Sequence, residues 1–159
     1  MTKTYVIATG NELDTIELGK VMAAVFENRV VAVSGDLGAG KTHLAKGFAL
    51  GLGIEKHITS PTFNIMNVYT KNDKTFYHID AYRLTDPDMI YDIGIEEALE
   101  PKGITLIEWA ENVEHILNKG YVKIYIEKTD DENKRLMFIT ADKESIDRMA
   151  KIIYEDTVR

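Results

Sequence analysis

The sequence RVVAVSGDLGAGKT, residues 29–42, joins a continuous apolar run to a glycine-rich turn. The run Val30–Val33 is typical of a strand that is buried on both faces of a parallel sheet. Gly35–Thr42 matches the pattern G-x-x-x-x-G-K-[ST] at every fixed position, and apolar residues recur at helical spacing over Lys41–Leu52. A buried strand, a glycine turn and a helix in this order predict a phosphate-binding loop.

The residue types in this loop suit the binding of a nucleotide. Glycine allows positive φ and lets the main-chain N–H groups approach phosphate oxygens closely. We expect Lys41 to bridge the β- and γ-phosphates of ATP and the Thr42 hydroxyl to ligate Mg²⁺. The predicted nucleotide contacts in the loop are Gly35, Asp36, Leu37, Gly38, Ala39, Gly40, Lys41 and Thr42. Lys41 is also a predicted catalytic residue.

Strand and helix patterns alternate along the rest of the chain. The predicted strands are Thr4–Ala8, Arg29–Ser34, Phe63–Thr70, Thr75–Asp80, Ile104–Glu108, Tyr121–Lys128 and Arg135–Thr140. The predicted helices follow an N-cap at Asn11 or Asp14, then cover Lys41–Leu52, one or two pieces of Asp86–Glu100, Trp109–Asn118 and Asp142–Tyr154. This pattern predicts an α/β fold: a three-layer P-loop NTPase-like domain with a mostly parallel central sheet and an inserted antiparallel hairpin.

Composition limits the class of protein. The chain has 159 residues, 45% of them hydrophobic and none of them cysteine, so we expect one domain over residues 1–159 with no disulfide or thiolate metal ligand. The net charge of −7 argues against tight independent binding to nucleic acid. No stretch resembles a signal-peptide core or the ~20 apolar residues of a membrane span. We therefore expect a cytoplasmic protein that does not bind a membrane.

Two carboxylates stand where apolar strands end. Asp80 follows Phe76–Ile79, and Glu108 follows Ile104–Ile107. The carboxyl ends of parallel strands meet at one edge of a sheet, which is the usual position of a nucleotide site. Either carboxylate can hold Mg²⁺ while the other polarises the attacking water, and the sequence leaves this division open. The predicted catalytic residues are thus Asp80, Glu108 and Lys41, and the predicted metal ligands are Thr42, Asp80 and Glu108.

Other residues near these carboxylates give weaker signals. A hydroxyl in Ser60-Pro61-Thr62 can face the γ-phosphate, or the segment simply ends a loop before an extended stretch. His78 shares a strand face with Asp80 because side chains alternate along a strand. Trp109, the only tryptophan, is expected to pack at a strand–helix junction and to report on the site by fluorescence.

Four segments in this order resemble the TsaE (YjeE) family of small bacterial ATPases: Gly35–Thr42, Ser60–Phe63, His78–Leu84 and Ile107–Trp109. The resemblance implies that Lys41 and Thr42 bind phosphate and Mg²⁺ and that Asp80 and Glu108 complete the metal and water shell. It also implies that Thr62 and Trp109 border the site, and that Arg135 matches a basic residue near the adenine. His43 and Ala81 depart mildly from the family pattern, at positions with no assigned chemistry.

The same resemblance implies a function. Members of the TsaE family are required to make threonylcarbamoyladenosine in tRNA, and they act with a TsaB–TsaD pair. Their hydrolysis of ATP is thought to reset that assembly between turnovers, so tRNA is met only indirectly, through the complex. The implied cofactors are ATP/ADP and Mg²⁺. Because the sequence contains no evident arginine finger, we expect low ATPase activity without the partners.

Three other classes of nucleotide-binding protein are alternatives. A small-molecule kinase usually has an arginine-rich lid, whereas the arginines here do not cluster along the sequence. A GTPase usually contains Asn-Lys-x-Asp, and Asn118-Lys119-Gly120-Tyr121 lacks the aspartate. The sequence excludes a non-hydrolysing nucleotide sensor least.

Overall fold

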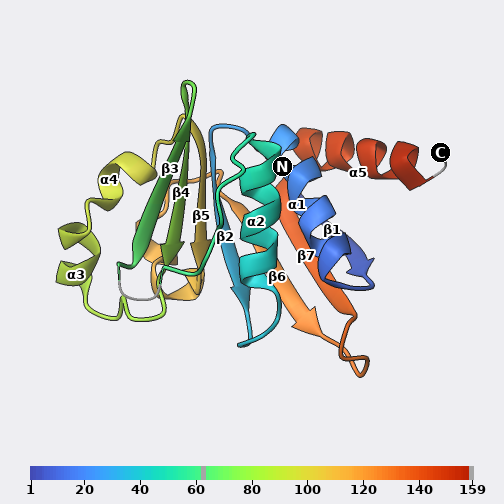
Figure 1. The fold of residues 1–159 in the computed structure, drawn as a ribbon, viewed down its shortest axis with the longest axis horizontal. Helices are drawn as coiled ribbons and strands as arrows, with labels where there is room; N and C mark the ends of the chain where they lie inside the picture. Colours follow the sequence, from blue (N-terminus) through green and yellow to red (C-terminus); the bar gives the residue numbers. More distant parts are fainter. Residues whose placement is uncertain (62–63, 158–159) are drawn as a thin grey trace.

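The computed structural model describes residues 1–61 and 64–157, and within them seven strands form one mixed sheet (Figure 1). The strands are β1 (Thr2–Thr9), β2 (Arg29–Gly35), β3 (Met66–Lys71), β4 (Lys74–Asp80), β5 (Gly103–Glu108), β6 (Val122–Lys128) and β7 (Arg135–Asp142). Their order across the sheet is β1-β7-β6-β2-β5-β4-β3. The four central strands run parallel, and β1, β7 and β3 are each antiparallel to their neighbours. The predicted parallel centre and antiparallel hairpin are confirmed.

Helices cover both faces of this sheet. One face carries α1 (Glu12–Val25), α2 (Lys41–Gly51) and α5 (Lys143–Thr157). The other face carries α3 (Pro87–Asp92), α4 (Ile95–Ala98) and two 3₁₀ turns, η1 (Ala110–Asn112) and η2 (Glu114–Ile116). Figure 1 shows α3 and α4 beside β3, α2 in front of β2 and β6, and α1 next to α2 over β7. The fold therefore has the three layers that the sequence predicts.

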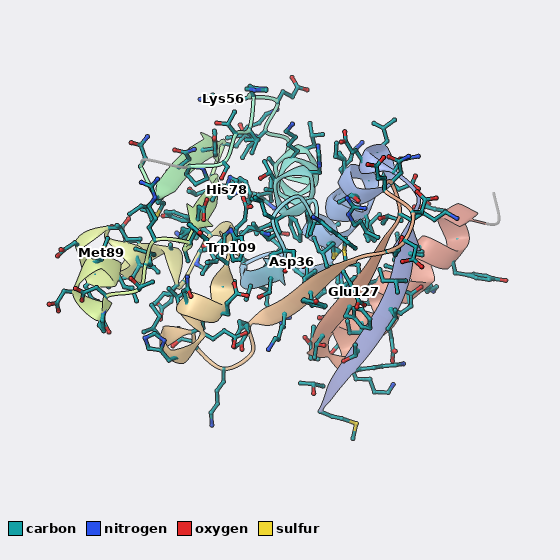
Figure 2. The ribbon with its side chains drawn as sticks, turned by 90° about the horizontal axis from the view of Figure 1, so that it is seen from below. Asp36, Lys56, His78, Met89, Trp109 and Glu127 are labelled. Carbon is teal, nitrogen blue, oxygen red and sulfur yellow. The ribbon has the colours of Figure 1, made fainter. Side chains whose placement is uncertain are left out.

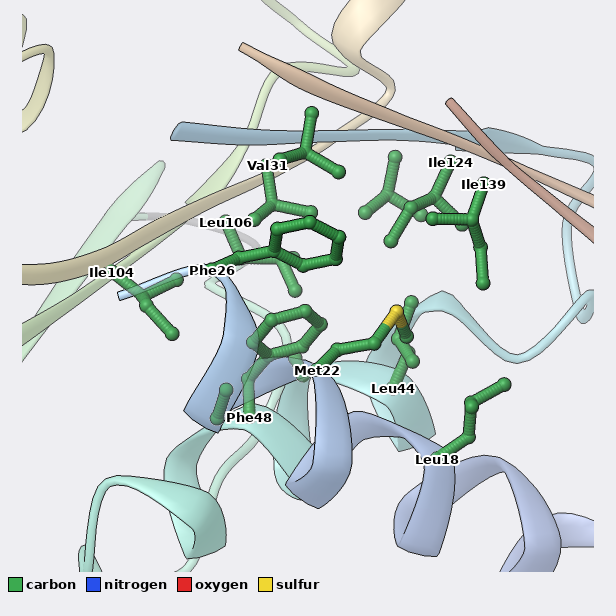
Figure 3. Close-up of a cluster of buried hydrophobic side chains, with 14 of the residues drawn as sticks. Leu18, Met22, Phe26, Val31, Leu44, Phe48, Ile104, Leu106, Ile124 and Ile139 are labelled. Carbon is green, nitrogen blue, oxygen red and sulfur yellow. The ribbon is translucent and has the colours of Figure 1, made fainter. Parts of the chain in front are cut away.

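The central strand β2 feeds both hydrophobic cores. Val31 and Val33 pack with α1 and α2, whereas Val30 and Ala32 pack with the opposite layer. This alternation explains the continuous apolar run, because neither face of a covered central strand meets water. Figure 3 shows the first core, in which Phe26 and Phe48 lie against the sheet.

Helices α1 and α2 pack at very close range because glycine faces glycine. A Cβ atom added to Gly47 would lie 2.2 Å from the carbonyl oxygen of Ile16 and 2.9 Å from the Cα of Gly19. No side chain fits between the helices at this point. The contact fixes α2, and with it the loop that begins α2, against the rest of the fold.

One predicted element is wrong. The helix expected over Trp109–Asn118 is replaced by the turns η1 and η2. Trp109 has a φ of 56°, in the left-handed region, which interrupts any regular helix at its start. The side-chain amide of Asn112 then donates to the carbonyl of Ala81 over 2.8 Å, so the turn is fixed to the end of β4.

The other predicted elements are present with small shifts. Asn11 caps α1 by accepting the Asp14 N–H at 2.9 Å, and the segment Asp86–Glu100 contains α3 and α4. Strand β3 starts at Met66, and Phe63 at the predicted start lies outside the described residues. None of the helices in the described ranges is both long enough and apolar enough to span a bilayer.

Candidate functional site

A cavity of about 560 Å³ lies where β2, β4 and β5 reach their carboxyl ends, the lower edge of the sheet in Figure 1. It opens beside the N-terminus of α2. Its walls are Leu37, Gly38, Gly40, Lys41, Thr42, His43, Ser60, Asp80, Tyr82, Glu108 and Trp109. The fold thus brings together the glycine loop, both strand-end carboxylates, Ser60 and Trp109.

The loop between β2 and α2 depends on glycine at its first position. Gly35 has a φ of 154°, and a Cβ there would lie 2.7 Å from the carbonyl oxygen of Ile126 in β6. A side chain would therefore strain the backbone and push the loop off its neighbouring strand. Gly40, which precedes α2, has no side chain that could accept hydrogen bonds from the first N–H groups of the helix. These N–H groups form the positive end of α2, and this end borders the cavity.

Lys41 is held at the base of the loop. Its Nζ donates to the carbonyl oxygens of Gly35 at 2.5 Å and Asp36 at 2.8 Å, and the residue is 5% exposed. The same atom lies 4.2 Å from the centre of the Trp109 ring. Burial lowers the pKa of Lys41, and the charge of Glu108 acts against this shift.

The Thr42 hydroxyl contacts Glu108 across the cavity. Its Oγ1 lies 3.3 Å from Oε1 and 3.4 Å from Oε2 of the carboxylate, in position to donate to either. Thr42 stands in the first turn of α2, and Glu108 is the last residue of β5. A hydroxyl and a carboxylate from separate elements therefore converge on one point.

Asp80 lies beside Glu108, because the parallel register of β4 and β5 places the two residues opposite each other. Both oxygens of Asp80 accept hydrogen bonds: Oδ2 from the Ser60 hydroxyl at 3.1 Å and Oδ1 from the Tyr82 N–H at 3.0 Å. These bonds fix the orientation of the carboxylate. In this structure the Ser60 hydroxyl therefore donates its hydrogen bond to Asp80. The other predicted contact in this segment, Thr62, lies outside the described residues.

His78 is a member of the site that the sequence patterns only partly revealed. Its Nε2 lies 2.5 Å from Oε2 of Glu108, and the residue is 0% exposed. The strand alternation predicted its shared face with Asp80 but not its contact with Glu108. In Figure 2, His78 and Trp109 lie between Met89 of α3 and Glu127 of β6.

Arg135 approaches the loop from β7 and does not belong to the cavity wall described above. Its Nε donates to the carbonyl of Ala39 at 3.1 Å, and its Nη2 donates to that of Gly38 at 3.2 Å. Arg135 therefore supports the outside of the loop, and its contact with the adenine stays a prediction. Three other predicted contacts belong to the loop but do not line the cavity: Gly35, Asp36 and Ala39.

The donor types around the cavity suit a polyphosphate and a hard cation. Across residues 1–61 and 64–157, no cluster of three or more histidine, aspartate or glutamate side chains could hold a metal by itself. Mg²⁺ commonly takes only one or two protein ligands and completes its octahedron with water and phosphate oxygens. Thr42 with Glu108 or Asp80 fits that requirement.

Fold and site together define a three-layer α/β protein in which the central strand enters a G-x-x-x-x-G-K-T loop and helix, faced by two strand-end carboxylates. A family model described as "Threonylcarbamoyl adenosine biosynthesis protein TsaE" matches residues 9–137. The chain belongs to the TsaE family, whose members are proteins of tRNA threonylcarbamoyladenosine biosynthesis.

Individual relatives support this assignment. A protein of Rickettsia felis described as "tRNA threonylcarbamoyladenosine biosynthesis protein TsaE" is 41% identical over 131 residues, which cover 81% of this chain and 75% of the relative. A Bacillus subtilis protein with the same description is 37% identical over 131 residues, 82% of each chain. The solved structure described as "Crystal structure of Bacillus subtilus YdiB" superposes with a TM-score of 0.75 and 30% identity, over 99% of this chain and 98% of that one.

Proposed function

We propose that this chain is a Mg²⁺-dependent ATPase that acts within a TsaB–TsaD complex during threonylcarbamoyladenosine modification of tRNA. The observation that carries the proposal is the convergence of Lys41, Thr42, Asp80 and Glu108 on one cavity at the N-terminus of α2. An anion-binding helix end, an ammonium, a hydroxyl and two carboxylates are the groups that phosphoryl transfer to water requires. The family supplies the biological process.

Each side chain has a proposed task. Lys41 would leave the carbonyls of Gly35 and Asp36 and bind the β- and γ-phosphates. Thr42 would contribute a ligand to Mg²⁺, which neutralises charge on the phosphate oxygens when it is bound. Asp80 and Glu108 would complete the metal shell and orient the attacking water, since both face the same volume as Thr42.

We expect the isolated chain to hydrolyse ATP slowly. The cavity wall, as far as the described residues define it, contains no arginine. An arginine finger contributes ~10³–10⁵ to the rate in enzymes that use one. A partner protein that supplies such a charge, or that closes the cavity to water, would therefore accelerate turnover.

The first experiment tests nucleotide binding. At a ligand concentration near 100 times Kd, Mg-ATP should add ~2.7 kcal/mol to the free energy of unfolding, which raises Tm by several degrees. Lys41→Ala should lose most of that rise, whereas Lys46→Ala, the same charge change further along α2, should keep it. If Lys41→Ala gains as much stability from Mg-ATP as the wild type does, the phosphate site is wrong.

The second experiment separates an ATPase from a non-hydrolysing sensor. Phosphate release is measured with the chain alone and with TsaB–TsaD added. We expect slow release alone and faster release in the complex. Binding of Mg-ATP without release under either condition favours the sensor, and equal rates under both conditions contradict the role proposed for the partners.

A further inference from the structure

We infer that His78 is a positioning residue that holds one oxygen of Glu108, so that the other oxygen meets the metal or the water. The inference rests on the proposed ATPase function, and it assigns only one of the two carboxylate oxygens of Glu108 to the metal or the water. It starts from the 2.5 Å contact between His78 Nε2 and Glu108 Oε2, inside the protein and behind the cavity wall.

The sheet geometry makes this contact rigid. His78 of β4 stands opposite Leu106 of β5, and Glu108 lies two residues beyond Leu106 in β5. The histidine and the carboxylate therefore form a diagonal pair on one face of the sheet. The imidazole also stacks on Phe76, with ring centres 5.9 Å apart. With 0% of its surface exposed, His78 has no solvent into which to rotate.

The two oxygens of Glu108 consequently differ. Oε2 lies 2.5 Å from the histidine nitrogen, while the Thr42 hydroxyl lies almost equally far from the two oxygens, 3.3 Å from Oε1 and 3.4 Å from Oε2. A carboxylate that is only 3% exposed needs such a donor, because a buried charge without a partner is strongly disfavoured. Donation from Nε2–H therefore leaves Oε1 as the oxygen that is available to a ligand in the cavity.

Packing alone does not explain a histidine at this position. Among the described residues, Nδ1 of His78 is buried without a hydrogen-bond partner. An apolar side chain would fill the same space without an unsatisfied nitrogen, and an unsatisfied buried group in a folded protein calls for an explanation, of which a functional role is one. What an apolar side chain cannot supply is the N–H at the Nε2 position.

The decisive experiment compares two amides. The side-chain nitrogen of glutamine takes the place of histidine Nε2, whereas that of the shorter asparagine takes the place of Nδ1. We expect His78→Gln to stay within about threefold of wild-type kcat in the TsaB–TsaD complex. His78→Asn should lose about 10- to 100-fold, the usual effect of removing a partner of a metal ligand, with similar affinity for metal-free ADP.

A control separates positioning from lost stability. Thr105→Val removes another buried hydrogen bond, from Thr105 to the carbonyl of Ala98, on the strand that carries Glu108. This variant should lose stability but keep its kcat. Equal kcat values for the Gln and Asn variants, or a loss in Thr105→Val that matches the loss in His78→Asn, would overturn the inference.

A spectroscopic readout does not depend on turnover. With ¹⁵N-labelled histidine, His78 should show a proton on Nε2 that is shifted by its hydrogen bond, and Glu108→Gln should change that signal without changing those of His57 and His115, which lie outside the cavity wall. An Nε2 signal that is insensitive to Glu108→Gln contradicts the contact itself. A wild type that neither binds nor hydrolyses Mg-ATP contradicts the proposed function instead, whatever the histidine signal shows.

Discussion

The ammonium group of Lys41 lies 4.2 Å from the centre of the Trp109 ring. An aromatic face attracts a cation at this range, and the same ammonium donates hydrogen bonds to two main-chain carbonyls. A polyphosphate in the cavity would offer Lys41 a full negative charge in place of a ring and two dipoles. The Lys41–Trp109 contact is therefore the first one that we expect nucleotide binding to change.

Trp109 should report this change by fluorescence. Because Trp109 is the only tryptophan in the sequence, the tryptophan fluorescence of the protein comes from this residue alone. Its intensity should change as Mg-ATP is added and should reach a plateau when the site is saturated. The midpoint should agree with the Kd from an independent method. Lys41→Met should abolish most of the response, and Trp109→Phe should remove the signal while Mg-ATP still raises Tm. A flat titration in a wild type that binds nucleotide contradicts movement of Lys41.

Asp80→Asn and Glu108→Gln should reduce turnover far more than binding of ADP. Each variant keeps the shape of the side chain but removes the charge that holds metal or orients water, which we expect to cost about 100-fold or more in kcat. Phosphate release and ADP titration measure the two effects. Glu111→Gln removes an acid near Lys41 that is not part of the cavity wall and should be close to wild type. Unchanged hydrolysis in both test variants would falsify the assignment of these carboxylates.

Gly47→Ala should destabilise the fold although alanine is the better helix former. Helix propensity alone favours the change by ~1 kcal/mol. The new Cβ would lie 2.2 Å from the carbonyl of Ile16, however, so α1 and α2 must separate, and overpacking of this kind costs ~1–3 kcal/mol. A contact of 2.2 Å with a backbone atom places the cost at the upper end of this range, so we expect a net loss of about 2 kcal/mol and a Tm lower by several degrees, measured by thermal or urea unfolding. Lys46→Ala on the same helix is the control, and a rise in Tm for Gly47→Ala contradicts the close packing.

Asp142→Asn should lower stability at neutral pH but not in strong acid. Burial acts to raise the pKa of Asp142, but hydrogen bonds from the Ser145 N–H and the Arg29 guanidinium outweigh it and lower the pKa from 3.8 to about 2. A depressed pKa contributes stability above about pH 4, and that contribution is lost as the pH falls through about 2. The carboxylate is 45% exposed, so screening limits the effect to roughly 1 kcal/mol or less.

Urea unfolding at several pH values tests this prediction. The difference between wild type and Asp142→Asn should be constant from pH 7 to about pH 4 and should shrink towards pH 2. Asp156→Asn, an exposed acid near the other end of α5, serves as the control. A difference that persists unchanged at pH 2 contradicts the role of the Arg29–Asp142 pair.

The sequence predicted those parts of the fold whose signals are local. The apolar run Val30–Val33, the glycine loop and the strand-end positions of Asp80 and Glu108 are each written in a few adjacent residues, and the structure places them as expected. Helical spacing was misleading only after Glu108. Val113 and Ile116 are three residues apart, which suits a 3₁₀ turn as well as an α-helix.

The contacts that the sequence did not reveal depend on the order of the strands. His78 reaches Glu108 because β4 lies next to β5, and Arg135 reaches the carbonyl of Ala39 because the β6–β7 hairpin lies beside β2. Neither neighbour relation follows from hydrophobic periodicity. The sequence indicated Arg135 at the start of a strand and His78 on the strand face of Asp80, but it did not indicate which residues they contact.

The pairing of β1 with β7 has a consequence for how the chain folds during synthesis. Thr9 lies opposite Arg135, and the two residues are 126 positions apart in the sequence (135 − 9). A ribosome that adds ~5–20 residues per second needs about 6–25 seconds to reach Arg135 after it has added Thr9. In that interval β1 has no partner strand, although β2, α2, β4 and β5 are all synthesised before β7. The edge strand β1 therefore joins the sheet only after the central parallel strands and the glycine loop have been synthesised.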